Sequence, residues 1–427
     1  MKKQLYGAYH FLWAWLGAKM HKHPSRRLFV IGVTGTKGKT TTLELLNTIL
    51  EAAGKRTALL SSLREKINDE SRSKPADNSM PGRGYIQKFL RRARRAGCGY
   101  ALVEVTSQGV VQHRHRFIKW NIGVLTNLAP EHIESHGSFE NYRAAKLAFL
   151  KYVLKQGGKV FLNRDDKNFD FFAHELAHGG EKTIEYTRTD ERLKDNLARA
   201  ERSREREDFA GGAPDAPSAA RKSRFLLKNF NEENIAVAVA IAKDLGIADR
   251  IIEEALANFG GVPGRMEFVT EGPYAAIVDY AHTPDSQEAA YRAARDQFGD
   301  DEHAKLICVF GAAGGGRDKW KRPEMGKIAA HYCDEIILTD EDPYDEAPGE
   351  ILDEIAVGIE QVPYPRPEVT KILDRREALA HAIDIMREGD IVIATGKGSE
   401  DSIHLARGRK MAWNEKAVVQ ELLAGKK

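Results

Sequence analysis

Short apolar runs alternate along the chain with longer segments in which apolar residues recur every three or four positions. The short runs have the length and the β-branched composition of buried strands, and the longer segments have the spacing of helices that cover a sheet. This alternation is typical of parallel sheets whose strands are joined by crossover helices. The sequence therefore predicts an α/β fold.

The predicted strands form two series, one in each half of the chain. The first series comprises residues 28–33, 101–105, 122–126 and 159–162, and the second 274–280, 305–310, 335–338 and 391–394. A turn-rich pentapeptide at 260–264 separates the two series and is expected to act as a hinge. We therefore predict two domains, residues 28–262 and 263–427, after an amino-terminal segment of residues 1–27.

The amino-terminal segment carries aromatic residues at helical spacing and ends in basic residues. We expect a helix that packs on its own domain, because apolar residues at this spacing are usually core. The alternative is a weak contact with a membrane surface, with Trp13 and Trp15 at headgroup level. No small-residue cleavage site follows the segment, which argues against a secretory signal.

The composition excludes several classes of protein. A chain of 427 residues is too long for one ordinary core. Its 42% apolar and 30% charged residues, without an apolar run near the ~20 residues of a spanning helix, exclude an integral membrane protein and wholesale disorder. The net charge of only +3 disfavours a nucleic-acid binder. Dense charge at residues 187–224 predicts a flexible insertion.

The three cysteines, Cys98, Cys308 and Cys333, lie far apart and form no C-x-x-C pair. This spacing argues against a disulfide framework and against a zinc site built from cysteines. We therefore expect unpaired thiols and a reducing cytoplasmic compartment.

The candidate chemistry begins in the glycine-rich turn between the first predicted strand and a helix expected at residues 39–53. Backbone N–H groups of such a turn can approach phosphate oxygens, and the helix amino terminus adds a favourable dipole. Lys39 would neutralise the β- and γ-phosphates of a nucleotide, and the Thr40 hydroxyl would bind Mg²⁺. The sequence fits a short G-T-x-G-K-T variant of the phosphate loop. The expected ATP-binding residues are Gly35, Thr36, Lys37, Gly38, Lys39, Thr40 and Thr41.

Two further residues have the chemistry of ligands for a divalent metal. Glu104 ends a predicted strand, and His132 follows the next one. A carboxylate and an imidazole beside a phosphate loop are suitable metal ligands. Taken alone, His132 would be structural rather than a ligand.

Other polar residues are candidates for nucleotide contacts. Asn231 and Asn234 offer amide groups to adenine edges, although paired asparagines also form ordinary turns. In the second domain, Asp279 would accept from ribose hydroxyls, and Arg265 and Lys319 would contact phosphate. The sequence therefore predicts a nucleotide site to which both domains contribute.

Several motifs resemble those of the Mur ligases and occur in the order of that family. They are E-V-T-S at 104–107, V-Q-H-R at 111–114, T-N-L at 126–128, E-H-I-E at 131–134, N-Y-R-A-A-K at 141–146, G-R-M-E at 264–267, D-Y-A-H-T-P-D at 279–285, K-R-P at 321–323 and G-K-G-S-E at 396–400. The V-Q-H-R motif is similar to that of the members that add the third peptide residue. The resemblance implies a P-loop central domain with a mostly parallel sheet, followed by a carboxy-terminal Rossmann-like domain.

The resemblance also implies a reaction. In it, ATP converts a peptide carboxylate into an acyl phosphate, which the amine of an amino acid attacks, with release of ADP and phosphate. The implied cofactors are ATP and Mg²⁺, and the implied partners are an amino acid and a peptide-bearing acceptor of cell-wall synthesis in the cytoplasm. Lys146 matches a lysine that is carbamylated in the family and positions Mg²⁺ with Thr40, Glu104 and His132.

The residues that match substrate-binding positions of the family are Thr106, Ser107, Gln112, Arg114, His282, Asp342, Tyr344, Gly396 and Glu400. At 341–344 the sequence E-D-P-Y replaces the motif D-N-P-R, whose arginine recognises a carboxylate of diaminopimelate. Loss of this cation should disfavour diaminopimelate, and the added acid could favour an amine such as lysine. The uridine-binding domain of the family has no counterpart in residues 1–27, which leaves the natural acceptor open.

Two other functions remain open from the sequence alone. One is a folylpolyglutamate or cyanophycin-type ligase of the same superfamily, against which Gln112, Arg114 and the motif at 396–400 argue. The other is a nonreactive ATP-binding scaffold, which would have no need to keep Lys39 and Lys146 together. The sequence leaves the oligomeric state open.

Overall fold

The computed structural model describes residues 2–73, 79–82, 84–131, 136–190, 194–200, 231–269, 274–297, 304–316, 318–364 and 366–426. Contacts between Cα atoms divide the described chain into two compact units. Unit 1 contains the described residues up to 200 and residues 231–259, and unit 2 begins at residue 260.

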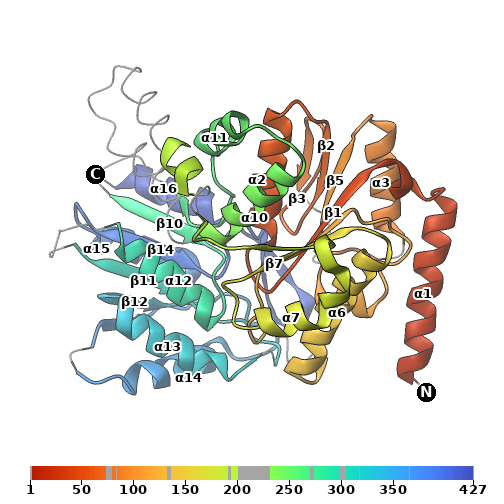
Figure 1. The fold of residues 1–427 in the computed structure, drawn as a ribbon. Coiled ribbons are helices and arrows are strands. Elements are labelled where there is room, and N and C mark those ends of the chain that lie inside the picture. The colour runs from red at the N-terminus through yellow and green to blue at the C-terminus, as the bar shows by residue number, and fades with distance from the viewer. Residues whose placement is uncertain are drawn as a thin grey trace. The chain divides into compact units, whose positions relative to one another are not determined.

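Unit 1 is built on an eight-stranded sheet with the order β4-β3-β2-β5-β1-β6-β7-β8 (Figure 1). Five neighbouring pairs, from β2 to β8, are parallel, and β2, β3 and β4 form an antiparallel edge. The strands are β1 Phe29–Thr34, β2 Thr57–Leu60, β3 Arg64–Ile67, β4 Glu70–Ser73, β5 Tyr100–Glu104, β6 Ile122–Leu125, β7 Lys159–Asn163 and β8 Thr183–Tyr186. Their carboxyl ends therefore bring the segments after β1, β2, β5 and β6 to one edge of the sheet.

Helices cover both faces of this sheet, as the two-sided burial of its strands requires. The helices α2 Lys39–Ala52, α10 Glu232–Asp244 and α11 Asp249–Ala257 contact one another on one face. The opposite core joins strand residues such as Val30 and Val103 to α3 Tyr85–Arg95 and α6 Phe139–Lys155. The shorter elements α4 Ser107–Val111, α7 Phe169–Leu176 and η2 Ala177–Lys182 complete unit 1.

The amino-terminal segment folds as α1 Lys2–Met20, which lies beside α3 (Figure 1), and is followed by η1 Pro24–Arg27. Gly17 and Ala18 are buried, and a Cβ on Gly17 would lie 2.8 Å from Gly84 Cα. One end of α1 is thus packed closely on unit 1, as the sequence predicts. Several aromatic side chains nearer its amino terminus remain exposed.

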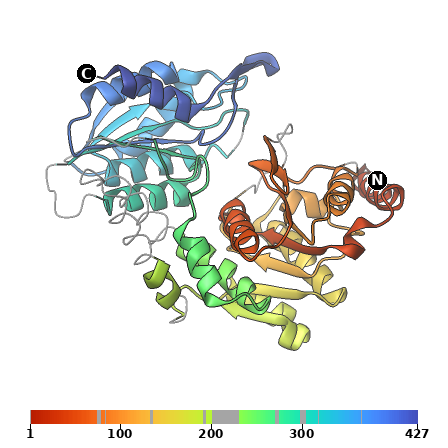
Figure 2. The ribbon, with the colours of Figure 1, turned by 90° about the horizontal axis from the view of Figure 1, so that it is seen from above.

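Unit 2 is coloured from green to blue in Figure 2. It is built on a six-stranded sheet with the order β13-β12-β11-β14-β10-β9, in which β9 is antiparallel to its neighbour and the other pairs are parallel. The strands are β9 Glu267–Phe268, β10 Ala275–Asp279, β11 Leu306–Phe310, β12 Glu335–Leu338, β13 Glu368–Lys371 and β14 Ile391–Thr395. One core packs α12 Pro284–Arg295, α13 Lys321–Tyr332 and α14 Pro348–Glu360 on the sheet, and a second packs α15 Arg375–Ile385 and α16 Glu415–Gly425. The pair β15 Ser402–His404 and β16 Lys410–Ala412, with η3 Ala406–Gly408 between them, follows β14.

All eight predicted strands are present, with ends that differ by at most one residue from the predicted limits. Six strands of the two sheets were not predicted: β2, β3, β4, β8, β9 and β13. Of these, β3, β4 and β13 carry charged and polar residues and lack the apolar run of a central strand. Of the predicted insertion at 187–224, residues 191–193 and those from 201 onward lie outside the described residues, and residues 194–200 are helical. Within the described residues, no helix has the length and apolarity needed to cross a membrane.

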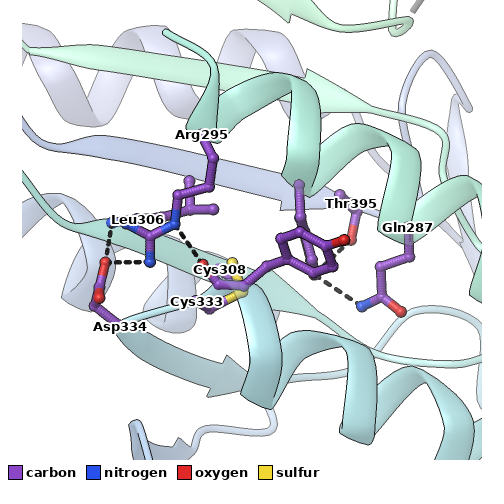
Figure 3. The surroundings of a disulfide bond; sticks show 9 residues. Gln287, Arg295, Leu306, Cys308, Cys333, Asp334 and Thr395 are labelled. Carbon is purple, nitrogen blue, oxygen red and sulfur yellow. Dashed lines mark hydrogen bonds and ion pairs between the residues drawn. A yellow bond between two sulfur atoms is a disulfide. The ribbon is translucent and has the colours of Figure 1, made fainter. Parts of the chain in front are cut away.

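The expectation that all three cysteines are unpaired is wrong for two of them. Cys308 on β11 and Cys333 form a disulfide (Figure 3), and only Cys98 is a free, buried thiol. The crossover through α13 returns the chain to β12, which lies next to β11, so two cysteines 25 positions apart in sequence become neighbours. Sequence separation alone therefore could not exclude this pair. Its presence also removes the cysteine-based argument for a reducing compartment.

Candidate active site

The predicted phosphate loop connects β1 to α2 and contains two glycines with positive φ. Gly35 has φ 153° and Gly38 has φ 78°. A Cβ atom on Gly35 would lie 1.8 Å from Thr126 Oγ1, and one on Gly38 would lie 2.0 Å from Asn234 Oδ1. Neither position has room for a larger residue, so the loop requires glycine for both conformation and space.

Residues that follow β6 hold the loop in place. Thr36 N donates to Asn127 O (3.0 Å), and Lys37 N donates to Asn127 Oδ1 (2.9 Å). Thr126 Oγ1 donates to Lys37 O (2.6 Å). These bonds fix the loop before any ligand is bound. The sequence identified the T-N-L motif only by its resemblance to the family. Its contacts with the loop could not be predicted, because they depend on β1 lying next to β6 in the sheet.

Two lysines converge on the loop from different helices. Lys39 Nζ donates to Gly35 O (3.1 Å) and Thr36 O (2.7 Å), and Lys146 Nζ donates to Gly35 O (2.6 Å). Both ammonium groups therefore share one carbonyl oxygen. The positive charge of Lys39 beside a phosphate loop would stabilise a bound polyphosphate.

Lys146 is almost completely buried, at 1% exposure, and its ammonium lies 4.4 Å from the centre of the Tyr142 ring. Burial, reinforced by the charge of Lys39, lowers the pKa of Lys146 well below its usual value, although Glu131 and Glu104 oppose the shift. A lowered pKa increases the fraction of neutral amine. The neutral amine is the form that can react as a nucleophile.

A cluster of oxygen atoms lies beside the loop at the carboxyl ends of β2 and β5. The carboxylate oxygen Glu104 Oε2 accepts from Thr40 Oγ1 (3.1 Å) and from Ser62 N (2.8 Å), and the hydroxyls of Thr40 and Ser62 are 2.8 Å apart. Glu104 is 2% exposed and forms no ion pair with a described residue. A buried carboxylate with neighbouring hydroxyls matches the oxygen donors that Mg²⁺ prefers, so these residues fit a divalent cation.

The other predicted metal ligand, His132, lies outside the described residues. Among the residues that are described, no cluster of three histidine, cysteine or acidic side chains suitable for a metal occurs. Among the described residues, the side chains that could hold a metal ion are therefore those of Thr40, Ser62 and Glu104. Ser62 was not predicted, because it carries no motif and reaches Glu104 only through the pairing of β2 with β5.

Asn231 and Asn234 lie at the start of α10, behind the loop. Asn234 Oδ1 accepts from Thr42 Oγ1 (3.3 Å), and Asn234 Nδ2 donates to Asn231 Oδ1 (3.2 Å). Both side chains are buried. The structure thus gives Asn234 a role in packing α10 against the loop and α2, while adenine contact stays a prediction.

The predicted acceptor residues gather around α4. The Thr106 hydroxyl accepts from Gly109 N and caps this helix, and Ser107 Oγ lies 3.0 Å from His136 Nε2. Arg114 donates to Gln112 Oε1 and to the carbonyl oxygen of Met80. The structure brings Gln112 and Arg114 together, and Thr106 is engaged with its own helix.

Three predicted nucleotide residues of unit 2 have partners within that unit. Each oxygen of Asp279 accepts one backbone N–H, from Met266 (2.6 Å) and Ala281 (2.7 Å). The guanidinium of Arg265 stacks on the Tyr280 ring at 4.0 Å. Lys319 pairs with Glu346 (3.0 Å). Their predicted contacts with ribose and phosphate stay predictions.

The predicted amino-acid residues of unit 2 meet at the carboxyl ends of β12 and β14. Lys397, which is fully buried, donates to Asp342 Oδ1 (2.8 Å) and to Glu400 Oε2 (2.6 Å). His404 N also donates to Asp342 Oδ1 (2.8 Å), and the ring of Tyr344 lies beside that of His404. The sequence predicted a preference for lysine as the added amino acid because of the Asp342 carboxylate. One oxygen of this carboxylate, Oδ1, already accepts hydrogen bonds from Lys397 and His404 of the same chain.

Two more residues border this cluster. His282 Nδ1 lies 2.8 Å from Tyr280 O, and Tyr280 OH donates to Glu400 Oε1 (3.1 Å). Gly396 has φ 109°, and a Cβ atom there would lie 2.8 Å from Glu341 Oε2. The motif at 396–400 is therefore packed against the segment at 341–344.

Glu341 is buried, and its Oε2 atom has no hydrogen-bond partner among the described residues. Burial raises the pKa of Glu341 to about 7, although Lys321 and Lys397 oppose the shift. Because the folded state holds this proton more tightly than the unfolded chain, the contribution of Glu341 to stability is most favourable at low pH and is lost as pH rises from about 4.5 to about 7.

We expect the Glu341→Gln variant to lose this pH dependence. The free energy of unfolding of the variant minus that of wild type should be larger at pH 8 than at pH 5, by up to about 3 kcal/mol. Urea unfolding at both pH values measures the effect, with the exposed Glu388→Gln variant as control. Parallel pH profiles for wild type and Glu341→Gln would show that the carboxyl titrates normally.

Comparison with known proteins connects both units to one family. Residues 33–242 match the Mur ligase middle domain, and residues 264–398 match the Mur ligase glutamate ligase domain. The UDP-N-acetylmuramoyl-L-alanyl-D-glutamate--2,6-diaminopimelate ligase of Syntrophomonas wolfei is 34% identical over 415 residues, which cover 97% of this chain and 82% of the relative. The chain belongs to the Mur ligase family.

Other Mur ligases are similarly close in sequence. The ligase of the same name from Thermosynechococcus vestitus is 37% identical over 393 residues, covering 90% of this chain and 75% of the relative. The UDP-N-acetylmuramyl-tripeptide synthetase of Roseiflexus sp. is 34% identical and covers 96% and 81%. The family resemblance and the predicted enzyme class are therefore confirmed: the chain is an ATP-dependent ligase that forms carbon–nitrogen bonds.

Solved structures agree on the fold. A UDP-N-acetylmuramoyl-L-alanyl-D-glutamate--2,6-diaminopimelate ligase superposes with a TM-score of 0.58 at 23% identity, covering 93% of this chain and 79% of the other. The bifunctional folylpolyglutamate synthase/dihydrofolate synthase of Yersinia pestis gives 0.64 at 16% identity, covering 97% and 93%. The predicted α/β class is thus confirmed for this Mur ligase family member.

Proposed function

We propose that this chain joins an amino acid to the carboxylate of a peptide-bearing acceptor. An oxygen of the acceptor carboxylate attacks the γ-phosphorus of ATP, and the bond to ADP breaks. The amine of the amino acid then attacks the acyl carbon, phosphate leaves, and the amine loses a proton. The observation that carries this proposal is the convergence of Lys39, Lys146, Thr40 and Glu104 on one phosphate loop.

Each of these residues supplies part of the chemistry. Lys39 would leave the carbonyl oxygens of its own loop to contact the phosphates, and Thr40 and Glu104 would hold Mg²⁺. A bound Mg²⁺ would screen the repulsion between the triphosphate and the acceptor carboxylate. The neutral amine of Lys146 would add to carbon dioxide and lose a proton, which yields a carbamate. That change would convert a neutral amine into an anion beside the metal.

The relatives from Syntrophomonas wolfei and Thermosynechococcus vestitus are named for the acceptor UDP-N-acetylmuramoyl-L-alanyl-D-glutamate, and we propose an acceptor of this peptide class for this chain. The amino acid would bind in unit 2 at Asp342, Tyr344, Gly396 and Glu400. Tyr344 stands where the family motif has an arginine, so diaminopimelate should gain no advantage from its second carboxylate. Because Asp342 is paired with Lys397, its charge gives no added reason to prefer lysine as the amino acid. The preference for lysine over diaminopimelate then depends only on the absence of the motif's arginine. ATP consumption would place the reaction in the cytoplasm.

Release of ADP tests the function. The chain is expected to release ADP only when ATP, Mg²⁺, a muramoyl-dipeptide acceptor and an amino acid are all present, and diaminopimelate should not be the fastest amino acid. Tetrahydrofolate with glutamate serves as the matched rival pair, because the fold is shared with folylpolyglutamate synthases. If ADP were released only with tetrahydrofolate and glutamate, the acceptor would be a folate and not a muramoyl-dipeptide. If neither substrate pair caused release of ADP, the proposed ligase function would be contradicted.

A further inference from the structure

One side of α1 carries apolar side chains that stay exposed. Tyr9, Leu12, Trp13 and Met20 are 44%, 51%, 37% and 66% exposed. Relative to Tyr9, the other three are three, four and eleven positions further along the chain, a spacing that places all four on one side of a helix. We call this set the α1 stripe. Apolar side chains gathered on one exposed face mark a surface that binds a partner or a membrane, whereas isolated ones are ordinary.

The helix that carries the stripe is held on unit 1 by other residues. Gly17 packs closely against Gly84, Ala18 is buried, and Phe11 meets the Phe117 ring edge to face. Figure 1 shows α1 at the margin of unit 1, next to α3. A helix that is docked in this way presents only its exposed side to a partner or to lipid.

The carboxyl end of α1 lies in a basic part of the chain. Residues 1–43 contain eight lysines and arginines and no aspartate or glutamate. Four of these cations are exposed at and just after the end of α1, and none of the four forms an ion pair with a described residue: Lys19, Lys22, Arg26 and Arg27. The stripe and these cations thus adjoin each other along the chain.

The neighbouring helix α3 adds to this positive charge. Residues 84–103, which contain α3, include five lysines and arginines and no acidic residue. This helix contacts both α1 and η1. Burial, together with the charges of Arg91 and Lys88, lowers the pKa of His21, which follows α1. Two basic segments therefore meet around the end of α1, and their combined charge is complementary to an anionic surface.

We propose that the α1 stripe and the surrounding cations dock the chain on the surface of a bilayer that contains anionic phospholipids. The aromatic and apolar side chains enter the boundary between headgroups and acyl chains, and the lysines and arginines lie over the lipid phosphates. A second copy of the chain could also cover an apolar stripe, but two copies would bring the same positive charges together. The charge around α1 therefore favours lipid as the occupant.

Sedimentation with vesicles tests docking without ATP or substrate, so its result is independent of ligase activity. The full chain is expected to bind vesicles of equal parts phosphatidylcholine and phosphatidylglycerol at least about tenfold more tightly than vesicles of phosphatidylcholine alone. Raising the salt concentration should weaken binding, because salt screens the charge of the anionic headgroups.

Leu12→Ala combined with Trp13→Ala tests the stripe. This variant should weaken binding to the mixed vesicles at least about tenfold, because it removes apolar area that would leave water. Its control is Leu373→Ala combined with Tyr364→Ala, which removes two exposed apolar side chains of unit 2 and should leave binding unchanged.

Arg26→Gln combined with Arg27→Gln tests the charge. Loss of two cations should weaken binding to the mixed vesicles about 30-fold. Lys167→Gln combined with Arg250→Gln removes the same charge from exposed positions elsewhere in unit 1 and should leave binding unchanged. Thermal unfolding shows whether each variant is folded.

The proposal is overturned when the mixed vesicles bind no chain, or when either control weakens binding as much as the variant to which it is matched. It is also overturned when only the arginine variant weakens binding, because the chain would then adsorb by charge without inserting the stripe. Sedimentation without vesicles tests the other occupant. A wild-type dimer that Leu12→Ala with Trp13→Ala dissociates would assign the stripe to a second copy and overturn the lipid contact.

Discussion

Replacing Lys146 with alanine is expected to abolish nearly all ADP release, and added acetate is expected to restore part of it. The variant removes the buried amine that contacts Gly35 O and with it the proposed carbamate beside the metal. Loss of one electrostatic stabiliser of this kind reduces turnover about 100-fold to 1,000-fold. Acetate is small enough to enter the space left by the side chain, and its carboxylate would replace the carbamate. The measurement is kcat with and without acetate.

The control for this result is Lys151→Ala. Lys151 lies on the same helix, α6, but is half-exposed and pairs with Glu175, so its loss should leave kcat close to that of wild type. Two outcomes would count against the carbamate. One is full activity of Lys146→Ala, and the other is a loss that acetate, at any concentration, does not reduce while the variant remains folded.

The pattern of strands and the phosphate loop were predictable because both are local properties of the sequence. Gly35, Gly38 and Lys39 lie within five consecutive residues, so strand, turn and helix can be recognised together. The carboxylate of Glu104 could be named from its place at the end of a strand. Its contact with Ser62 could not, because this depends on which strands become neighbours in the sheet.

Two wrong or incomplete expectations have the same physical origin. Cys308 and Cys333 are distant in sequence but adjacent through the crossover between β11 and β12. Asp342 was expected to be available to a substrate amine, but Lys397 from the end of β14 neutralises it. A side chain's chemistry can be read from the sequence, whereas the partner that alters its charge or reactivity is supplied by the topology. The low pKa of Lys146 is a third example, since it follows from burial.

A Gly38→Ala variant is expected to lose ATP-dependent activity although it removes no functional group. The new methyl carbon would lie 2.0 Å from Asn234 Oδ1, and φ at this position is 78°. Because the Asn234 side chain is buried, we expect the loop to shift away from α10, which would displace Lys39 and Thr40 from the phosphates. A displacement of about 1 Å in such a site reduces kcat/KM about 100-fold.

Gly54→Ala separates the effect of space from that of backbone strain. Gly54, at the exposed end of α2, has φ 70°, close to that of Gly38, but no described atom lies within 4 Å of the position that its new methyl carbon would take. Each variant should lose about 1 kcal/mol of stability through the left-handed backbone, and only Gly38→Ala should lose kcat/KM for ATP. Equal kinetics in the two variants would mean that the contact between Gly38 and Asn234 does not position the loop.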